Sequence, residues 1–227
     1  MSEILAHLRT LADPDVAAQK AAYHKTTRTV LGVPNPAINA AVKSWRAARD
    51  TQQWLTEADA LWTSGIFEAR IAAGKLLIKA RYSEHEEDVW EMILGWMPDL
   101  DGWAISDHVA DAGARRVMSD LDRLTVLEGW TTCDHLWRRR AALVFTLPLA
   151  KLPHPTPAHT AAREQVLRWA ADYTREPEWF LQKAVSWWLR TLAKHDTARV
   201  QAFLEVHAPQ MKAFALKDVR RVLPDPA

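Results

Sequence analysis

The segment DGWAISDHVADAG, residues 101–113, places an indole and two carboxylates at helical spacing. Trp103, Asp107 and Asp111 follow one another at intervals of four, so in a helix they share one stripe. A helix that faced a core would carry Leu or Val at these positions. The stripe is therefore expected to face either water or a charged ligand.

Arg140 is a second unusual residue, because the helical pattern of its segment places it on an apolar stripe. A guanidinium there needs an anionic or polar partner, since burial of an unpaired charge is costly. Asp107 is the candidate partner. The apolar neighbours on the stripe are Leu136, Trp137, Leu143, Val144 and Leu147.

Two adjacent tryptophans in the segment 177–194 cannot serve the same purpose, because neighbouring residues point to different faces of a helix. Trp188 shares its stripe with apolar residues, which predicts a core position. Trp187 is predicted to face outward among cations. The stripe of Trp188 holds Leu181, Val185 and Leu192, and that of Trp187 holds Phe180, Lys183, Arg190 and Thr191.

Helical periodicity dominates the chain, and no segment shows the sustained alternation of a strand. N-caps are expected at Ser119, Asp134 and Thr160, and the only long connection at 148–159. Helices are predicted at 3–12, 15–27, 36–48, 66–80, 86–97, around Trp103, and at 119–130, 134–147, 160–173, 177–194, 198–208 and 210–222.

A weak internal repeat organises these helices. Arg70, Arg140 and Lys183 each precede small residues and an apolar run, with Asp107 midway across the longer step. This spacing fits a helix-pair unit of about 35–45 residues. Such pairs stack through a shared core, and one helix of each pair lines the inner surface. The sequence therefore predicts an all-α chain of helical repeats, stacked into a curved solenoid with a concave binding face and forming one domain over 1–227.

On successive inner helices, Trp103, Asp107, Arg140 and Trp187 would bring two indoles, a carboxylate and a cation to one surface. Each feature alone has a simpler explanation. A single Trp in a helical repeat usually packs in the core, and an Asp–Arg pair is usually a structural bridge. Their convergence favours a site of binding or catalysis.

The composition narrows the chemistry of that site. The 227 residues are 48% hydrophobic and 25% charged, with a net charge of +1, a globular composition without the basic excess of many nucleic-acid binders. A single cysteine, scattered histidines and the absence of GxGxxG and GxxxxGK motifs predict neither a metal site nor a nucleotide cofactor. No apolar run has the length of a membrane span, and the N-terminus carries charges where a signal peptide is apolar, so a cytoplasmic location is expected.

Four segments of the sequence resemble the AlkD-type DNA alkylation repair family, DNA glycosylases built from HEAT-like repeats. They are AAYHKTTRTVLGVPNP, DGWAISDHV, LWRRRAALVF and FLQKAVSWWLR, in the family's order and at compatible spacing. The resemblance implies excision of N3- and N7-alkylated purines from DNA without flipping the base into a pocket. It also implies Asp107 as the catalytic carboxylate, Trp103 and Trp187 as aromatics against the sugar-phosphate of the lesion, Arg140 as the supporting cation, and Tyr23 as a DNA-facing tyrosine.

Two positions depart from the family pattern. Asn39 stands where the family commonly has Arg, and Thr191 stands where it commonly has Glu. The first departure bears on the N-terminal DNA contacts and the second on the detail of the cleft.

The residue types also fit this chemistry by themselves. A cationic alkylpurine leaves as a neutral base without a general acid, so the reaction needs a carboxylate that stabilises the developing sugar cation and positions water. Indole faces attract cationic character and exclude water. The expected partner is double-stranded DNA with alkylated bases, bound by a monomer that joins the nucleoid when on DNA. Phosphates would be held by Lys43, Arg139, Lys183, Arg190 and Lys194.

Two other functions stay open from the sequence. One is a catalytically weak repeat protein that binds distorted DNA, and the other is a helical scaffold that binds a protein partner. The nearly neutral net charge favours the scaffold. The convergence of Trp103, Asp107, Arg140 and Trp187 favours the enzyme.

Overall fold

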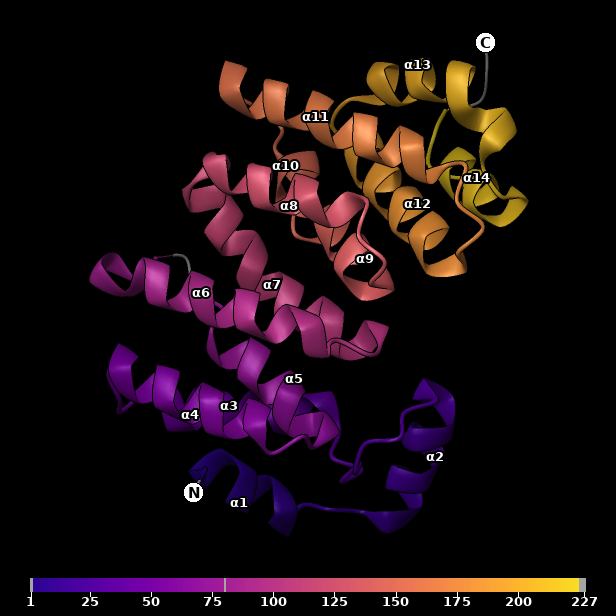
Figure 1. Ribbon diagram of the computed structural model, residues 1–227. Helices are drawn as coiled ribbons and strands as arrows, with labels where there is room; N and C mark the ends of the chain where they lie inside the picture. The colour runs from indigo at the N-terminus through magenta and orange to yellow at the C-terminus, as the bar shows by residue number, and fades with distance from the viewer. Residues whose placement is uncertain (1, 80, 225–227) are drawn as a thin grey trace. The chain divides into compact units, whose positions relative to one another are not determined.

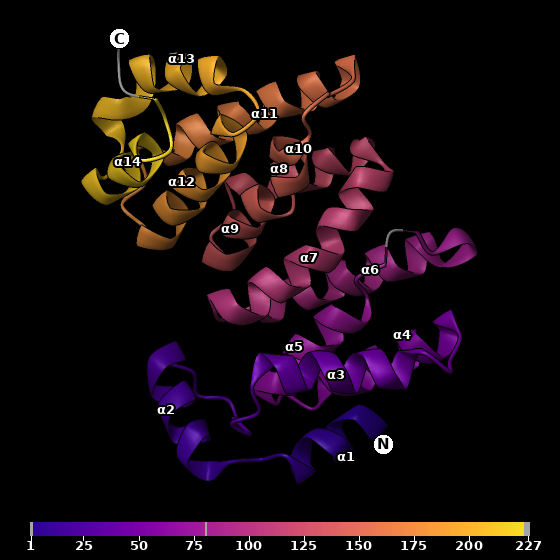
Figure 2. The ribbon, with the colours of Figure 1, turned by 180° about the vertical axis from the view of Figure 1, so that it is seen from behind.

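The computed structural model describes residues 2–79 and 81–224, and every regular element within them is a helix. The prediction of an all-α chain is therefore confirmed. The chain divides into two compact units, unit 1 (Met1–Ser119) and unit 2 (Asp120–Ala227), which Figures 1 and 2 show from opposite sides. The expectation of a single domain over 1–227 stays a prediction beside this division.

Unit 1 is built from helix pairs that stack on one another. The pair α4–α5 packs on the pair α6–α7, with α4 against α6 and α5 against α7, while α1 and α3 cover the other side of α5. The elements are α1 (Glu3–Thr10), α2 (Pro14–His24), α3 (Asn35–Arg46), α4 (Thr51–Thr63), α5 (Phe67–Leu76), η1 (Ser83–His85), α6 (Glu86–Trp96), η2 (Met97–Asp99) and α7 (Trp103–Ser119).

Unit 2 repeats the arrangement. The pair α8–α9 packs on α11–α12, with α8 against α11 and α9 against α12, and α12 also contacts α13 and α14. The elements are η3 (Leu121–Arg123), α8 (Leu124–Thr131), α9 (Leu136–Val144), α10 (Leu147–Lys151), α11 (Pro157–Tyr173), α12 (Trp179–Ala193), α13 (Thr197–His207), η4 (Ala208–Gln210) and α14 (Ala213–Arg220).

The second helix of each pair carries the residues singled out in the sequence. Trp103 and Asp107 lie on α7, Arg140 on α9 and Trp187 on α12. The predicted core position of Trp188 is confirmed, since its side chain is 0% exposed and its indole nitrogen donates to the Thr146 hydroxyl at 3.2 Å. A buried tryptophan usually finds such a partner for its N–H.

Helix α4 is absent from the predicted set, and its packed face includes a charged residue, Glu57. In the structure Glu57 is buried, and its carboxylate accepts hydrogen bonds from the Ser2 hydroxyl at 2.6 Å and the Ile4 amide at 2.8 Å. The carboxylate thereby satisfies one of the free amides at the start of α1, that of Ile4. Helix α10 likewise occupies part of the predicted connection 148–159.

The three predicted N-caps are wrong, because in each case another polar residue nearby caps the helix. Ser119 is the last residue of α7, and His135, not Asp134, caps α9 through its ring nitrogen. Helix α11 starts earlier than predicted, because the hydroxyl of Thr156 caps it and Pro157 occupies its first position. Proline is favoured there, since the first amide of a helix has no intrahelical acceptor.

Helix α2 buries no residue, so polar contacts hold it in place. The fully buried Glu68 of α5 accepts hydrogen bonds from the amides of Leu31 at 2.8 Å and Gly32 at 2.9 Å, and Lys20 of α2 lies 3.6 Å away. Gly32 has φ +83°, and a Cβ there would collide with the carbonyl of Asp13. Only glycine allows the loop to approach α2 this closely.

The described residues contain no helix that combines the length and the apolar character needed to cross a bilayer.

Candidate active site

The stripe that begins at Trp103 lies outside the packed core of unit 1. Trp103 and Asp107 are half-buried and Asp111 is exposed, whereas Ile105 and Val109 on the adjoining face are buried. Trp103 is the first residue of α7, and Asp107 lies one turn further along the helix. The start of α7 therefore presents an indole and a carboxylate side by side.

Trp103 belongs to an aromatic cluster with the end of α2. Its ring lies 5.0 Å from that of His24 and 6.3 Å from that of Tyr23, and His24 contacts Phe67 of α5 at 4.8 Å. Tyr23 is 71% exposed, an unusual state for a large aromatic side chain. The structure thus brings together two predicted residues, Tyr23 and Trp103. The contribution of His24 and Phe67 was missed, because it depends on contacts between distant segments.

His24 adds an uncharged polar group to this cluster. Burial lowers the pKa of its imidazole, the charge of Lys20 lowers it further, and Glu68 opposes the shift. Its Nδ1 is buried without a hydrogen-bond partner. The ring is therefore neutral near pH 7, and it adds no positive charge beside Trp103.

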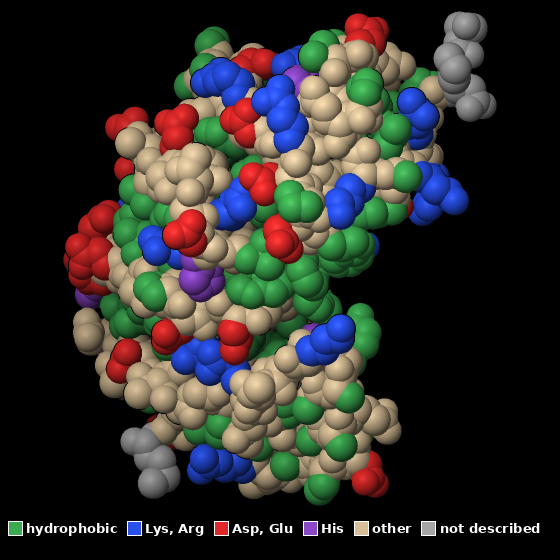
Figure 3. All heavy atoms as spheres, turned by 45° about the vertical axis from the view of Figure 1, so that its right-hand side comes forward, with side chains coloured by type: hydrophobic (Ala, Val, Ile, Leu, Met, Phe, Trp, Pro, Cys, Tyr) green, Lys and Arg blue, Asp and Glu red, His purple; other side chains and the backbone are tan. Residues whose placement is uncertain are grey.

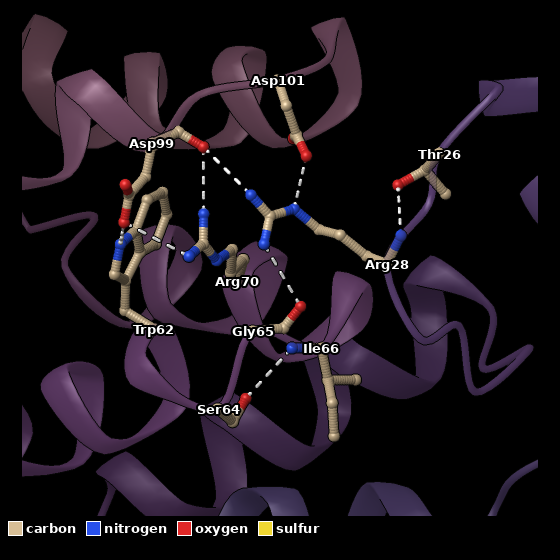
Figure 4. A network of polar contacts seen from close by, with 9 residues as sticks. All are labelled: Thr26, Arg28, Trp62, Ser64, Gly65, Ile66, Arg70, Asp99 and Asp101. Atoms are coloured by element: carbon tan, nitrogen blue, oxygen red, sulfur yellow. Dashed lines mark hydrogen bonds and ion pairs between the residues drawn. The ribbon is translucent and has the colours of Figure 1, made fainter.

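A network of polar contacts holds the segment that leads into α7 (Figure 4). The guanidinium of Arg28 pairs with Asp101 at 2.6 Å and donates to the carbonyl oxygens of Asp99 at 3.1 Å and Gly65 at 3.4 Å. Arg28 follows α2, and Asp99 and Asp101 precede Trp103. The network therefore ties the end of α2 to the start of α7, the two segments that supply the aromatic cluster.

Arg70 completes this network from α5. It donates to the carbonyl oxygen of Asp99 at 3.0 Å and pairs with the Asp99 carboxylate at 3.3 Å. Its guanidinium lies 4.3 Å from the ring of Trp62, which in turn stacks on Trp96 at 4.6 Å. Burial lowers the pKa of Arg70, followed by the charge of Arg28, and the two aspartates offset these effects. Two neighbouring guanidiniums are thus neutralised by Asp99 and Asp101.

Replacing Arg28 by Lys should lower the free energy of unfolding by about 1–2 kcal/mol, because an ammonium cannot reach all three oxygens at once. Chemical denaturation would measure the change. The control is Arg9→Lys, at an exposed position of α1, which should leave stability unchanged. Equal stability of the two variants would show that the network does not hold the start of α7.

The opposite side of α7 packs tightly on α5. A Cβ at Gly74 would lie 2.8 Å from the carbonyl oxygen of His108, so a glycine is needed at this crossing. Burial, and then the charge of Lys75, lowers the pKa of His108 to about 4, and its Nδ1 has no hydrogen-bond partner. The residue that follows Asp107 is therefore neutral under ordinary conditions.

The low pKa of His108 predicts a loss of stability in acid. Below pH 6.5 the unfolded chain takes up a proton that the folded chain refuses until about pH 4. Each pH unit in this window should cost up to about 1.4 kcal/mol of unfolding free energy. Denaturant titrations at pH 7 and pH 5 would measure it, and His108→Gln should show a smaller dependence, because His24, whose pKa is also lowered, still contributes. An unchanged dependence in the variant would assign it to other groups.

Unit 2 supplies the other two candidate residues. Arg140 is 4% exposed, donates to the carbonyl oxygen of Phe180 at 3.0 Å, and has its guanidinium carbon 6.0 Å from the ring centre of Trp187. Trp187 is partly exposed. These two partners, a backbone carbonyl and an aromatic ring, explain in part how a guanidinium can lie on an apolar stripe. Its pairing with Asp107, a residue of unit 1, stays a prediction.

The predicted phosphate-binding cations differ in their surroundings. Lys43 and Lys194 are exposed, and Lys183 and Arg190 are half-buried on α12. Arg139 is already engaged, because its guanidinium pairs with Glu176 at 2.6 Å and donates to the carbonyl oxygen of Thr131 at 3.3 Å. Burial lowers the pKa of Arg139, but the hydrogen bond and charge of Glu176, together with Tyr173, raise it by more. Arg139 therefore has a structural contact in this protein, and its role as a phosphate ligand stays a prediction.

The two departures from the expected pattern lie in different environments. Asn39 is exposed on α3, where a longer cation would be free to reach outward. Thr191 is buried, and its hydroxyl donates to the carbonyl oxygen of Trp187 at 2.8 Å. The hydroxyl of Thr191 therefore has its hydrogen-bond partner within α12. Across the described residues, no group of three or more His, Cys, Asp or Glu side chains is arranged to hold a metal ion.

The whole chain was compared with family models, curated proteins and solved structures. Residues 4–223 match the family model described as DNA alkylation repair enzyme, and no curated protein matches the chain. A solved structure described as a predicted DNA alkylation repair enzyme from Enterococcus faecalis has 20% identity and a TM-score of 0.76, covering 95% of this chain and 98% of that one. AlkD2 from Streptococcus mutans has 15% identity and a TM-score of 0.62, covering 92% and 100%. At these identities the likeness establishes a shared fold.

Proposed function

The chain belongs to the DNA alkylation repair enzyme family, and from this premise we propose that it is a monofunctional DNA glycosylase acting on cationic N3- and N7-alkylpurines in duplex DNA. The observation that carries the proposal is the half-buried start of α7, which lies outside the packed core. There Trp103 contacts Tyr23 and His24, and Asp107 follows one turn later. Aromatic faces beside a carboxylate suit a substrate that becomes more cationic in the transition state.

The reaction needs few protein groups. Breaking the N-glycosidic bond moves its electron pair onto the alkylpurine, which leaves as a neutral base and needs no proton. Positive charge develops on the deoxyribose, where the carboxylate of Asp107 stabilises it and orients the water that adds to the sugar. The water releases one proton to solvent. A neutral His24 suits this site, since an imidazolium would repel the cationic lesion.

DNA binding would rest on lysines and arginines that face solvent. Lys43 and Lys194 are exposed, and Lys183 and Arg190 are half-buried, so all four can meet phosphates without unfolding a helix. The lesion need not enter a deep pocket, since Tyr23 and Trp103 are accessible at the surface. Because phosphate contacts release counterions, duplex affinity should fall steeply with salt.

The decisive experiment is the release of 7-methylguanine from methylated duplex DNA by the purified protein. We expect free base and an abasic site, with the strand left intact, because a monofunctional glycosylase cleaves only the N-glycosidic bond. Unmethylated duplex is the control. A protein that binds the methylated duplex and releases neither 7-methylguanine nor 3-methyladenine under single-turnover conditions would refute the glycosylase assignment.

A further inference from the structure

Four aromatic side chains of unit 2 form a continuous series, here named the aromatic row: Trp137, Phe180, Trp179 and Phe214. The ring centres of Trp137 and Phe180 are 4.8 Å apart, and those of Phe180 and Trp179 are 4.9 Å apart. Trp179 and Phe214 stack at 5.5 Å with 26° between their planes. The row therefore runs from α9 across the first turn of α12 to α14.

A buried glutamine holds the end of this row in place. Gln182 is 0% exposed, and its amide nitrogen donates to the carbonyl oxygens of Tyr173 at 2.9 Å and Thr174 at 2.8 Å. Its carbonyl oxygen accepts from the amide of Lys212 at 3.1 Å, directly before α14 begins. Gln182 thus fixes α14 on α12, and this contact places Phe214 beside Trp179.

The row is accessible, and cations accompany it. Trp179 is 46% exposed, and the ammonium of Lys183 lies 5.0 Å from its ring centre. Lys217 lies one helical turn after Phe214, and the exposed Lys212 precedes α14. Figure 3, which brings this side of unit 2 forward, shows hydrophobic side chains together with Lys and Arg side chains on the surface.

The acidic residues near the row do not cancel these cations. Glu178 is exposed at the start of α12, and Asp218 pairs with Arg221 at 3.5 Å. An open hollow of about 540 Å³ lies along α14, and its lining adds two cations to Lys217. The lining residues are Ala213, Leu216, Lys217, Arg220 and Arg221. Positive charge therefore prevails along the surface of α14 that the row reaches.

We propose that the aromatic row binds a single-stranded segment of DNA, with unpaired bases against Trp179 and its neighbours and phosphates on Lys183 and Lys217. Every base has a face that stacks on an aromatic ring, so a series of rings with interspersed lysines binds a single strand without reading its sequence. In an intact duplex the faces of the bases are covered by neighbouring base pairs, so they cannot stack on the rings. The binding does not need a lesion, and it shares Lys183 with the duplex contacts proposed above.

The test compares single-stranded and double-stranded DNA without lesions. Fluorescence anisotropy of the full chain would measure the affinity for a labelled oligothymidylate of twenty nucleotides and for a duplex of the same length. Trp179→Ala should weaken single-strand binding about tenfold and duplex binding less. Trp179→Phe, which keeps an aromatic face, should restore most of the single-strand affinity.

The matched control is Trp45→Ala. Trp45 is also a partly exposed tryptophan with a cation over its ring, since the guanidinium of Arg49 lies 4.4 Å away, but it belongs to α3 of unit 1. This variant should bind oligothymidylate like the parent protein. Thermal melting of each variant confirms that the fold is retained.

Two outcomes would overturn the proposal. One is a parent protein that does not bind oligothymidylate, which would leave a protein partner as the occupant of the row. The other is an equal loss of single-strand affinity in Trp179→Ala and Trp45→Ala. Release of 7-methylguanine is measured on the same parent preparation, so failure of this proposal and failure of the glycosylase proposal are distinguished.

Discussion

Replacing Asp107 by Asn should remove most of the excision rate while fold and duplex binding are retained. The amide has nearly the same shape as the carboxylate, and Asp107 is only half-buried, so packing changes little. What is lost is the negative charge that stabilises the developing sugar cation. Loss of one preorganised electrostatic group costs about 3–4 kcal/mol of transition-state stabilisation, or a factor of roughly 10²–10³ in rate. Single-turnover release of 7-methylguanine would measure it.

The size of this effect should depend on the lesion. A base with a more labile glycosidic bond, such as 3-methyladenine, needs less stabilisation and should suffer less than 7-methylguanine. Asp111→Asn is the matched control, because Asp111 lies on the same stripe one turn further along and is exposed. A lowered thermal midpoint with an unchanged excision rate in Asp107→Asn would assign the carboxylate a structural role instead.

The adjacent tryptophans of α12 should give opposite phenotypes. Trp188→Ala removes a side chain that is 0% exposed, leaves a cavity and removes the hydrogen bond to Thr146. The free energy of unfolding should fall by about 3–5 kcal/mol. Trp187→Ala should instead lower the excision rate, because the family resemblance implies that this indole, which lies beside Arg140, contacts the sugar-phosphate of the lesion.

Only a small stability change is expected for Trp187→Ala, since its side chain is partly exposed and the contact with Arg140 is worth about 0.5–1 kcal/mol. Denaturation curves and single-turnover rates of both variants would separate the two roles. An unfolded Trp187 variant together with a stable, less active Trp188 variant would mean that the two faces of α12 have been assigned the wrong way round.

Helical periodicity alone was enough to predict the fold class of this protein and the buried or exposed faces of several helices. The spacing of apolar residues predicted an all-α chain, the core position of Trp188 and a stripe at Trp103 and Asp107 that departs from the core. These inferences succeed because the geometry of a helix fixes which residues share a face over three or four positions. The order of the resembling segments predicted the family, which the match over residues 4–223 confirms.

Contacts between distant segments decided the rest. Helix α4 is absent from the prediction, and the burial of Glu57 on it depends on the Ser2 hydroxyl and the Ile4 amide, more than fifty positions away in the chain. Arg139 resembles a phosphate ligand in the sequence, yet Glu176 occupies its guanidinium. The lower pKa of His24 and its contact with Trp103 require α2, α5 and α7 to meet.

The aromatic row has the same origin, since Phe214 reaches Trp179 because α14 packs on α12, where Gln182 accepts from the amide of Lys212. The residue types and their local spacing predict which chemical groups are present and which face of a helix carries them. Whether a charge is paired, a ring is stacked or a polar atom is buried depends on the free energy of the whole packed unit. These features cannot be predicted from a short segment alone, because they depend on contacts with residues far along the chain.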